Sequence, residues 1–272
     1  MPRNDFRTPR LFVGDRLKAG AQVALDRDAA NYLGNVLRLG AGDAVLLFNG
    51  KDGEWRATLA ATGRKSLTAE VGELARQQPA AADLHFLFAP LKHARLDYMV
   101  QKAVELGVSR LQPVITQHTQ VARVNVERMQ ANVIEAAQQC GVLTIAEVAK
   151  PVQFNALVGR FAADRLLIFC DEDAEVRDPV AALSNVKSPP SALVPVDAPA
   201  AVTSLAVLIG PEGGFAEEER AALLKLKNVV RLALGPRIMR ADTAAVAALA
   251  LVQAVLGDWV AAPEKKSAAK KD

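Results

Sequence analysis

Two short turns near the C-terminal end of the chain combine glycines with charged residues. The first, residues 210–214 (GPEGG), holds three glycines, which let a ligand approach the backbone without interference from Cβ atoms. The second, residues 234–240 (LGPRIMR), ends in Arg240 and is followed by Asp242. A guanidinium stabilises developing negative charge, and a carboxylate accepts protons. The pair of turns predicts a ligand pocket, whereas either turn alone is more simply a tight connection.

The charge around the turns limits what this pocket can hold. Neither the G-x-G-x-x-G fingerprint of dinucleotide sites nor the G-x-x-x-x-G-K-[ST] fingerprint of P-loops occurs there. Residues 217–219 (EEE) follow the first turn and open a predicted helix, where three carboxylates would repel a phosphate group. We therefore expect a ligand without phosphate.

Each turn lies at the end of a predicted buried strand. Residues 205–209 (LAVLI) and 229–233 (VVRLA) are short apolar runs, typical of parallel strands that are covered on both faces. A helix is expected after each turn, and the second helix is expected to be capped by Asp242 or Thr243 and to extend to Leu256. Ligands of open α/β sheets bind at the carboxyl ends of strands, which is where these turns lie.

Composition excludes several other classes of protein. The 272 residues carry a formal net charge of +3, and 51% are hydrophobic, which is enough for a sizeable core. Cys140 and Cys170 stand in apolar contexts without a C-x-x-C spacing, so we expect reduced, buried thiols. The histidines lack metal-ligand spacing, so no metal site is expected. No apolar run is long enough to span a membrane and no signal-peptide core is present, so we expect a cytoplasmic protein without membrane contact.

Longer motifs around both turns resemble those of a known family. They are residues 208–215 (LIGPEGGF) and 234–244 (LGPRIMRADTA), with residues 101–108 (QKAVELGV) and 35–39 (NVLRL) upstream. This set resembles the RsmE-type uridine-N3 methyltransferases of small-subunit ribosomal RNA, which belong to the SPOUT superfamily. The resemblance extends over nearly the whole chain.

The resemblance implies an α/β fold, with a small N-terminal PUA-like β-barrel followed by a SPOUT α/β domain with a C-terminal trefoil knot. The expected limits are residues 1–75 for the barrel, 76–83 for a linker, 84–262 for the methyltransferase domain and 263–272 for a disordered basic tail. It also implies S-adenosyl-L-methionine as cofactor, bound at the interface of a homodimer. The expected partner is small-subunit ribosomal RNA or the assembled small subunit.

The expected cofactor site consists mainly of backbone in the two turns. Its predicted residues are Leu208, Ile209, Gly210, Glu212, Gly213, Gly214, Leu234, Gly235, Ile238 and Met239. For the reaction, Arg240 is expected to stabilise negative charge on the uracil base as N3 loses its proton. Glu212 or Asp242 is the candidate proton acceptor, although either carboxylate could instead orient Arg240 or cap a helix.

Positive charge is concentrated at the N-terminal end, where the first 65 residues hold 11 Lys and Arg against 7 Asp and Glu. An ordinary solvated barrel surface would show the same excess, but the resemblance favours an RNA-binding surface. The sequence departs from the family pattern at Gln138 and Val142, where an acidic residue and an arginine are expected. These departures put RNA docking on that helix in question. The residues expected to contact RNA are Arg10, Arg38, Lys92 and Arg237.

Two other functions stay open at the level of the sequence. A ribose 2′-O-methyltransferase of the same superfamily would use a similar fold with different loops. A non-catalytic ribosomal-RNA-binding protein would use the barrel and the basic tail without a cofactor. Nucleoside analysis distinguishes base methylation from ribose methylation, and calorimetry with S-adenosylmethionine distinguishes an enzyme from a binding protein.

Overall fold

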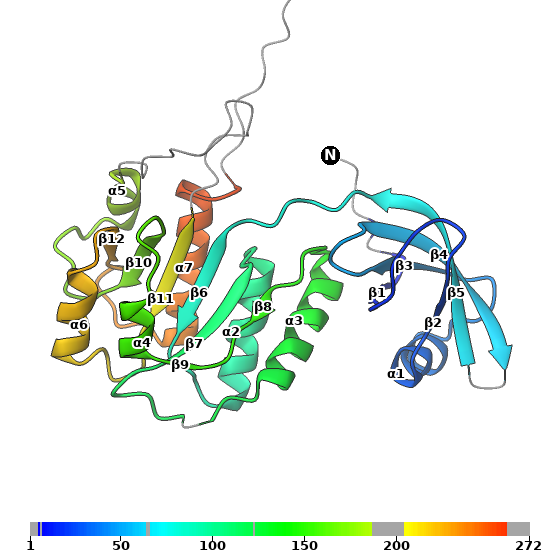
Figure 1. Ribbon diagram of the computed structural model, residues 1–272, viewed down its shortest axis with the longest axis horizontal. Helices are drawn as coiled ribbons and strands as arrows, with labels where there is room; N and C mark the ends of the chain where they lie inside the picture. The colour runs from blue at the N-terminus through cyan, green and yellow to red at the C-terminus, as the bar shows by residue number, and fades with distance from the viewer. Residues whose placement is uncertain (1–4, 6, 64–65, 122, 187–203, 260–272) are drawn as a thin grey trace, which may run out of the picture. The chain divides into compact units, whose positions relative to one another are not determined.

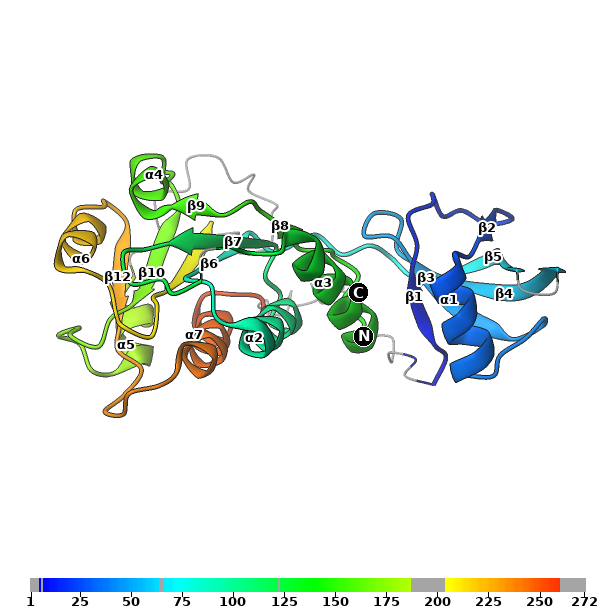
Figure 2. The ribbon, with the colours of Figure 1, turned by 90° about the horizontal axis from the view of Figure 1, so that it is seen from below.

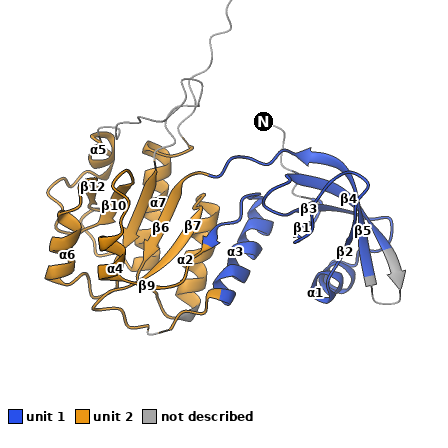
Figure 3. Cartoon of the chain, in the orientation of Figure 1, with its two compact units in different colours: residues 1–81, 127–147 blue, residues 82–126, 148–272 orange. Residues whose placement is uncertain are grey.

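The computed structural model describes residues 5, 7–63, 66–121, 123–186 and 204–259, so the predicted tail lies outside the described residues. The chain divides into two units, shown in different colours in Figure 3. Unit 1 comprises residues 1–81 and 127–147, and unit 2 comprises residues 82–126 and 148–272. Helix α3 (Val126–Cys140) therefore belongs almost entirely with the N-terminal strands, although it lies in the middle of the chain.

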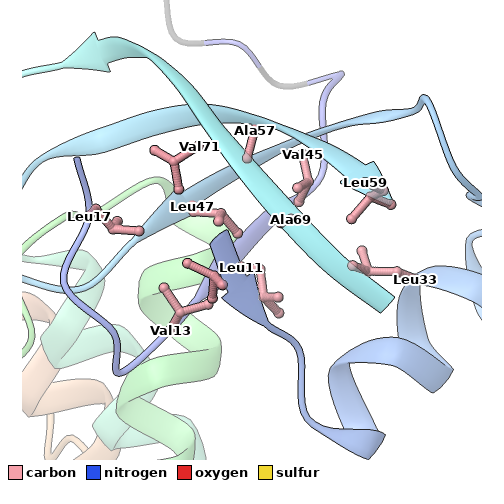
Figure 4. Packing of buried hydrophobic residues seen from close by; sticks show 11 residues of the cluster. Leu11, Val13, Leu17, Leu33, Val45, Leu47, Ala57, Leu59, Ala69 and Val71 are labelled. Carbon is pink, nitrogen blue, oxygen red and sulfur yellow. The ribbon is translucent and has the colours of Figure 1, made fainter. Parts of the chain in front are cut away.

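Unit 1 contains a five-stranded sheet that curls around an apolar core. Its strands follow the order β1-β3-β4-β5-β2, with β1 and β3 parallel and the other pairs antiparallel. Alternate residues of these strands point inward, and Figure 4 shows their side chains directed toward one another. The predicted small N-terminal β unit is confirmed as a curled sheet. The strands are β1 (Arg10–Phe12), β2 (Gln22–Ala24), β3 (Ala44–Phe48), β4 (Glu54–Gly63) and β5 (Ser66–Arg76).

A short helical segment connects β2 with β3. Helix α1 (Arg27–Asn31) is capped by Asp26, whose carboxylate accepts the backbone N–H of Ala29 at 2.7 Å. It continues directly into a π-helical turn, η1 (Tyr32–Val36), which buries Leu33 in the core. The sequence motifs did not predict this segment.

Helix α3 is attached to the sheet of unit 1 by hydrogen bonds at its C-terminal end. The backbone N–H of Phe12 donates to Oε1 of Gln138 at 2.8 Å, and Arg10 donates to the backbone oxygen of Gln138 at 3.3 Å. Arg76 donates to the backbone oxygen of Gly141 at 3.0 Å. Gln138 thus has a structural role here, which is compatible with the amide that replaces the expected acid.

Unit 2 is built on a sheet covered by helices on both faces, in which the pairs β10–β12, β10–β11, β11–β6, β6–β7 and β7–β9 are parallel. Its strands follow the order β12-β10-β11-β6-β7-β8, and β9 pairs with β7. Figures 1 and 2 show α4 and α6 on one face and α2, α5 and α7 on the other. The strands are β6 (Leu84–Phe88), β7 (Arg110–Ile115), β8 (Glu147–Val148), β9 (Val152–Gln153), β10 (Leu166–Cys170), β11 (Leu205–Ile209) and β12 (Val229–Leu232). The helices are α2 (His93–Glu105), α4 (Phe154–Gly159), α5 (Pro179–Ser184), α6 (Glu217–Leu224) and α7 (Ala241–Val255).

The predicted strands before the two glycine turns are confirmed as β11 and β12. The predicted cap of the second helix is wrong, because α7 begins at Ala241 and Arg240 occupies the N-cap position. Asp242 lies inside the first turn and accepts the backbone N–H of Thr243 at 3.0 Å. A carboxylate there is still favourable, since the positive end of the helix dipole lies nearby.

The two cysteines differ in environment: the expectation of a buried thiol is wrong for Cys140, and Cys170 is partly buried. Cys140 is exposed, because it follows the buried stripe of α3 that ends at Ala137. Cys170 ends β10, where burial and the neighbouring charges of Asp171 and Glu172 raise the pKa of its thiol to about 12.

This difference predicts selective alkylation of the native protein. Because the thiolate is the reactive form, we expect iodoacetamide to modify Cys140 at least about tenfold faster than Cys170. Peptide mass spectrometry of time points would measure both rates. Cys140→Ser is expected to remove the fast phase, and equal rates at the two cysteines would contradict the assignment of Cys170 as protected.

Candidate active site

The loops of unit 2 that could bind a ligand meet at one edge of the parallel sheet. Ile209 of β11 pairs with Phe88 of β6, and Cys170 of β10 pairs with Leu232 of β12. The loops that follow these strands therefore begin at the same level along the strand direction. This is the carboxyl edge at which open α/β sheets bind ligands.

A pocket of about 270 Å³ opens among the loops after β6, β7 and β11. Such a volume is just below the range of sites for drug-sized ligands and suits one small planar group. Its polar walls come from three segments that are distant in sequence. The lining residues are Pro90, Leu91, Lys92, Arg95, His118, Gln120, Val121, Pro211 and Glu212.

Glu212 from the first glycine turn forms an ion pair with Arg95 of α2. Their side chains are 45% and 42% exposed, so solvent weakens this pair and leaves it accessible to a ligand. Lys92, the N-cap residue of the same helix, is exposed at the pocket. The structure thus brings together the predicted residues Lys92 and Glu212, and it adds Arg95.

His118 connects the loop after β7 with the same glycine turn. Its Nδ1 atom lies 3.1 Å from the backbone oxygen of Gly214. A Cβ atom added to Gly213 would lie 3.4 Å from Cβ of His118, at van der Waals contact distance, so Gly213 lies directly beside the histidine. His118 therefore contacts the first glycine turn both by this packing and through the backbone oxygen of Gly214.

The side chain of Glu219 connects the loop after β7 with the end of the first glycine turn. Its carboxylate accepts the backbone N–H of Gln117 at 2.9 Å and that of Ala216, the N-cap residue of α6, at 3.1 Å. Glu219 is buried, so these bonds are protected from water. Of the three glutamates in the first turn of α6, Glu219 therefore holds the two loops of the site together.

The predicted cofactor residues fall into three groups. Leu208 and Ile209 are buried in β11, so their side chains belong to the core of unit 2. The turn at 210–214 lies at the sheet edge, with Gly214 at a φ of 72°. The turn at 234–240 does not line the pocket, and within it Ile238 is fully exposed, with a relative exposure of 103%.

The carboxylate cluster after β10 has a structural role. Asp171 is buried and accepts from Arg231 at 2.7 Å and from Arg220 at 3.3 Å. Burial alone would raise the pKa of Asp171, but hydrogen bonds from the two arginines outweigh it and hold the pKa below its ordinary value. Through these two arginines, Asp171 connects the end of β10 with β12 and α6.

The four residues expected to contact RNA occupy different environments. The expectation that Arg10 lies on the RNA-binding surface is wrong, because its side chain is only 5% exposed and pairs with Glu54. Lys92, Arg237 and Arg38 are exposed. Arg38 also has a φ of 59°, the left-handed conformation that L-residues adopt at a cost of about 1 kcal/mol. Such strain next to a π-helical turn is typical of functional sites.

A helix-covered sheet with a pocket at the carboxyl ends of its strands is an α/β architecture that can bind a ligand, here in a chain that also contains a small β unit. A family model described as "RNA methyltransferase domain" matches residues 78–253, and one described as "RNA methyltransferase PUA domain" matches residues 25–72. The chain therefore belongs to the RNA methyltransferase family.

Comparison with individual relatives and with a solved structure narrows the assignment to one family of RNA methyltransferases. The chain is 30% identical to the ribosomal RNA small subunit methyltransferase E of Synechocystis, over 91% of this chain and 78% of the relative. It is 29% identical to the Rickettsia conorii protein of the same name, over 90% and 94% of the two chains. The Neisseria gonorrhoeae enzyme, solved with bound S-adenosyl methionine, aligns with a TM-score of 0.77 at 26% identity, over 91% and 97%. The chain belongs to the ribosomal RNA small subunit methyltransferase E family.

Among the described residues, no helix is both long and apolar enough to cross a membrane.

Proposed function

We propose that the protein transfers a methyl group from S-adenosyl-L-methionine to N3 of a specific uridine in small-subunit ribosomal RNA. One observation carries the proposal. The similarity to the Neisseria enzyme, whose solved structure holds S-adenosyl methionine, extends over 91% of this chain. The family model of the RNA methyltransferase domain matches residues 78–253, which include both glycine turns. The substrate is ribosomal RNA, either free or within the assembled small subunit.

The residues of this chain suit S-adenosylmethionine. The proposed site offers backbone groups of the turns at 210–214 and 234–240 together with apolar Ile238 and Met239. A Cβ atom at Gly235 would meet no atom within 4 Å, so the second turn leaves open space beside its backbone. Adenosine and a sulfonium need hydrogen bonds and apolar contact but no phosphate site, which agrees with the acidic start of α6. When bound, the cofactor supplies an activated methyl group.

Arg240 is the residue proposed to stabilise the reaction. The imide nitrogen of uracil is a poor nucleophile until it loses its proton, and the negative charge then spreads onto O2 and O4. A guanidinium directed at either oxygen stabilises that charge as it develops. Arg240 is exposed at the N-terminus of α7, where a cation is unfavourable for the helix dipole, so local stability does not explain it. The carboxylates of Glu212 and Asp242 are candidates to accept the proton or to orient Arg240.

Arg38, Lys92 and Arg237 are proposed to bind the phosphates of the RNA. Unit 1 contributes Arg38, which has a strained backbone conformation and follows the exposed residues Tyr32 and Val36 in the sequence. An exposed aromatic ring can stack on an unpaired base, and an exposed arginine can contact a phosphate.

Arg38→Gly tests this surface with little cost to the fold. Glycine adopts a positive φ without strain, so we expect the thermal midpoint to change by no more than about 2 °C. RNA affinity is expected to fall, and the slope of log K against log salt concentration to decrease by about 1, as one phosphate contact is lost. Filter binding over a salt series measures both quantities. An unchanged slope would remove Arg38 from the RNA surface.

The proposal also includes the location of the protein, its homodimer and its trefoil knot, all of which the resemblance implies. We place the protein in the cytoplasm, where ribosomal RNA is available, and we propose a homodimer. Helix α7 supports a dimer because it is apolar around most of its surface and packs on α2 and α5 within its own unit. Light scattering at micromolar concentration would measure the mass. The trefoil knot remains part of the proposed fold.

Nucleoside analysis of ribosomal RNA from a strain lacking this protein is the decisive experiment. Loss of N3-methyluridine from the small subunit, restored by the wild-type gene, is the expected result. Loss of a 2′-O-methylated nucleoside would favour the ribose methyltransferase. An unchanged nucleoside profile together with no binding of S-adenosylmethionine in calorimetry would favour a non-catalytic RNA-binding protein.

A further inference from the structure

We propose that His118 is the group that accepts the N3 proton of the target uracil. This inference rests on the proposed function and assigns its missing proton acceptor. His118 lies in the pocket at the sheet edge, where it adjoins the turn proposed to hold the cofactor.

The first argument is the tautomer of the imidazole. The backbone oxygen of Gly214 can only accept a hydrogen bond, so Nδ1 of His118, 3.1 Å away, must carry the hydrogen atom. In the neutral ring, Nε2 then has a free lone pair. A neutral imidazole held in this way is a general base whose orientation is set by its own hydrogen bond.

The second argument is the charge of the pocket. Lys92 and Arg95 bring two positive charges to its wall, and Glu212 brings one negative charge. The excess of positive charge favours an anion and disfavours a sulfonium cation. A uracil that loses its N3 proton, flanked by the phosphates of its own strand, fits this environment better than the cofactor does.

The third argument compares His118 with the two candidate carboxylates. Asp242 does not line this pocket, and Glu212 shares its carboxylate with Arg95. A proton acceptor must have a lone pair available to the substrate. Nε2 of His118 meets this requirement at the pocket.

The reaction balances with His118 in this role. The N3–H bond breaks and its proton moves to Nε2, while N3 forms a bond to the methyl carbon as the bond from that carbon to sulfur breaks. The sulfonium becomes a neutral thioether, and the imidazole becomes an imidazolium. The imidazolium then releases its proton to water, and no further reactant is needed.

Two variants separate proton transfer from support of the turn. His118→Asn keeps an N–H group near the position of Nδ1 but has no basic nitrogen, and His118→Ala removes both functions. We expect both variants to lower the single-turnover methylation rate by about a hundredfold or more. His118→Asn is expected to keep the dissociation constants for S-adenosylmethionine and RNA within about threefold of wild type. Added imidazole is expected to restore part of the rate of His118→Ala, because it can diffuse into an open pocket.

The controls make each failure interpretable. His85→Ala removes a histidine that lies 3.4 Å from Asp83, on strand β6, and it is expected to methylate at the wild-type rate. A His118→Asn variant as fast as wild type, or one whose rate falls only in proportion to its cofactor affinity, would overturn the proposal. If wild-type protein itself produced no N3-methyluridine, the proposed function would fail instead, and the product analysis of the wild type distinguishes the two cases.

Discussion

Arg240→Ala is expected to lower the methylation rate by about a hundredfold or more while cofactor affinity stays within a few fold. The estimate follows from the removal of single donors that stabilise a developing oxyanion. Folding should change little, because Arg240 occupies the N-cap position of α7 without a capping hydrogen bond, so its side chain does not satisfy the helix end. Single-turnover kinetics with saturating RNA and cofactor measure the chemical step directly.

Two further variants identify what Arg240 contributes. Arg240→Lys keeps the charge but loses the planar, two-pronged donor, so we expect a rate between those of wild type and Arg240→Ala. Lys227→Ala removes an exposed cation just before β12 and serves as the control for bulk charge. A variant that loses cofactor binding in proportion to its rate would make Arg240 a structural part of the cofactor site, and a wild-type rate in Arg240→Ala would end its catalytic role.

The sequence predicted the elements of unit 2 well, because their signals are local. Strand β11 was predicted at its observed bounds, since five apolar residues are bounded by Gly210. A local signal also marks the end of α2, because the helix stops just before Gly107, whose φ of 79° only glycine adopts easily. The start of α7 was misplaced because Asp242 is a better capping residue than Arg240, so local preference pointed to the wrong position.

The assembly of the pocket could not be predicted in the same way. Arg95 and Glu212 are 117 positions apart, and their pairing depends on β6 lying beside β11. His118 is brought to Gly214 from 96 positions away by the order of strands in the sheet. Periodicity indicates which residues form strands but not which strands become neighbours. The burial of Arg10 could not be predicted for the same reason, because Arg10 is on β1 and its partner Glu54 is on β4.

Glu54 is the centre of a buried charge cluster in unit 1. Its side chain is 2% exposed and pairs with Arg10 and with Arg76, whose Nε lies 2.7 Å from Oε2. The same arginines donate to the backbone oxygens of Gln138 and Gly141 in and after α3. Burial alone would raise the pKa of Glu54, but hydrogen bonds from Arg76 and Arg10 outweigh it, so the pKa lies below its ordinary value.

Glu54→Ala is therefore expected to lower the free energy of unfolding of unit 1 by about 3–5 kcal/mol, since it leaves two buried guanidinium groups without a counter-charge. Urea unfolding followed by the fluorescence of Trp55, in a Trp259→Phe background, measures this value. Glu73→Ala is the matched control, because its carboxylate is 79% exposed and lies 3.7 Å from Arg56, and it should cost less than about 1 kcal/mol.

The acid dependence of stability provides an independent check on Glu54. Because its folded-state pKa is depressed, the stabilisation it contributes is fully present above the pKa of the unfolded chain. It is lost as the pH falls through the lower, folded-state pKa. Wild-type unit 1 should therefore lose stability between about pH 5 and pH 3, and Glu54→Gln should lose less over the same interval. Parallel acid profiles for the two proteins would show that this carboxylate does not hold the strands and α3 together.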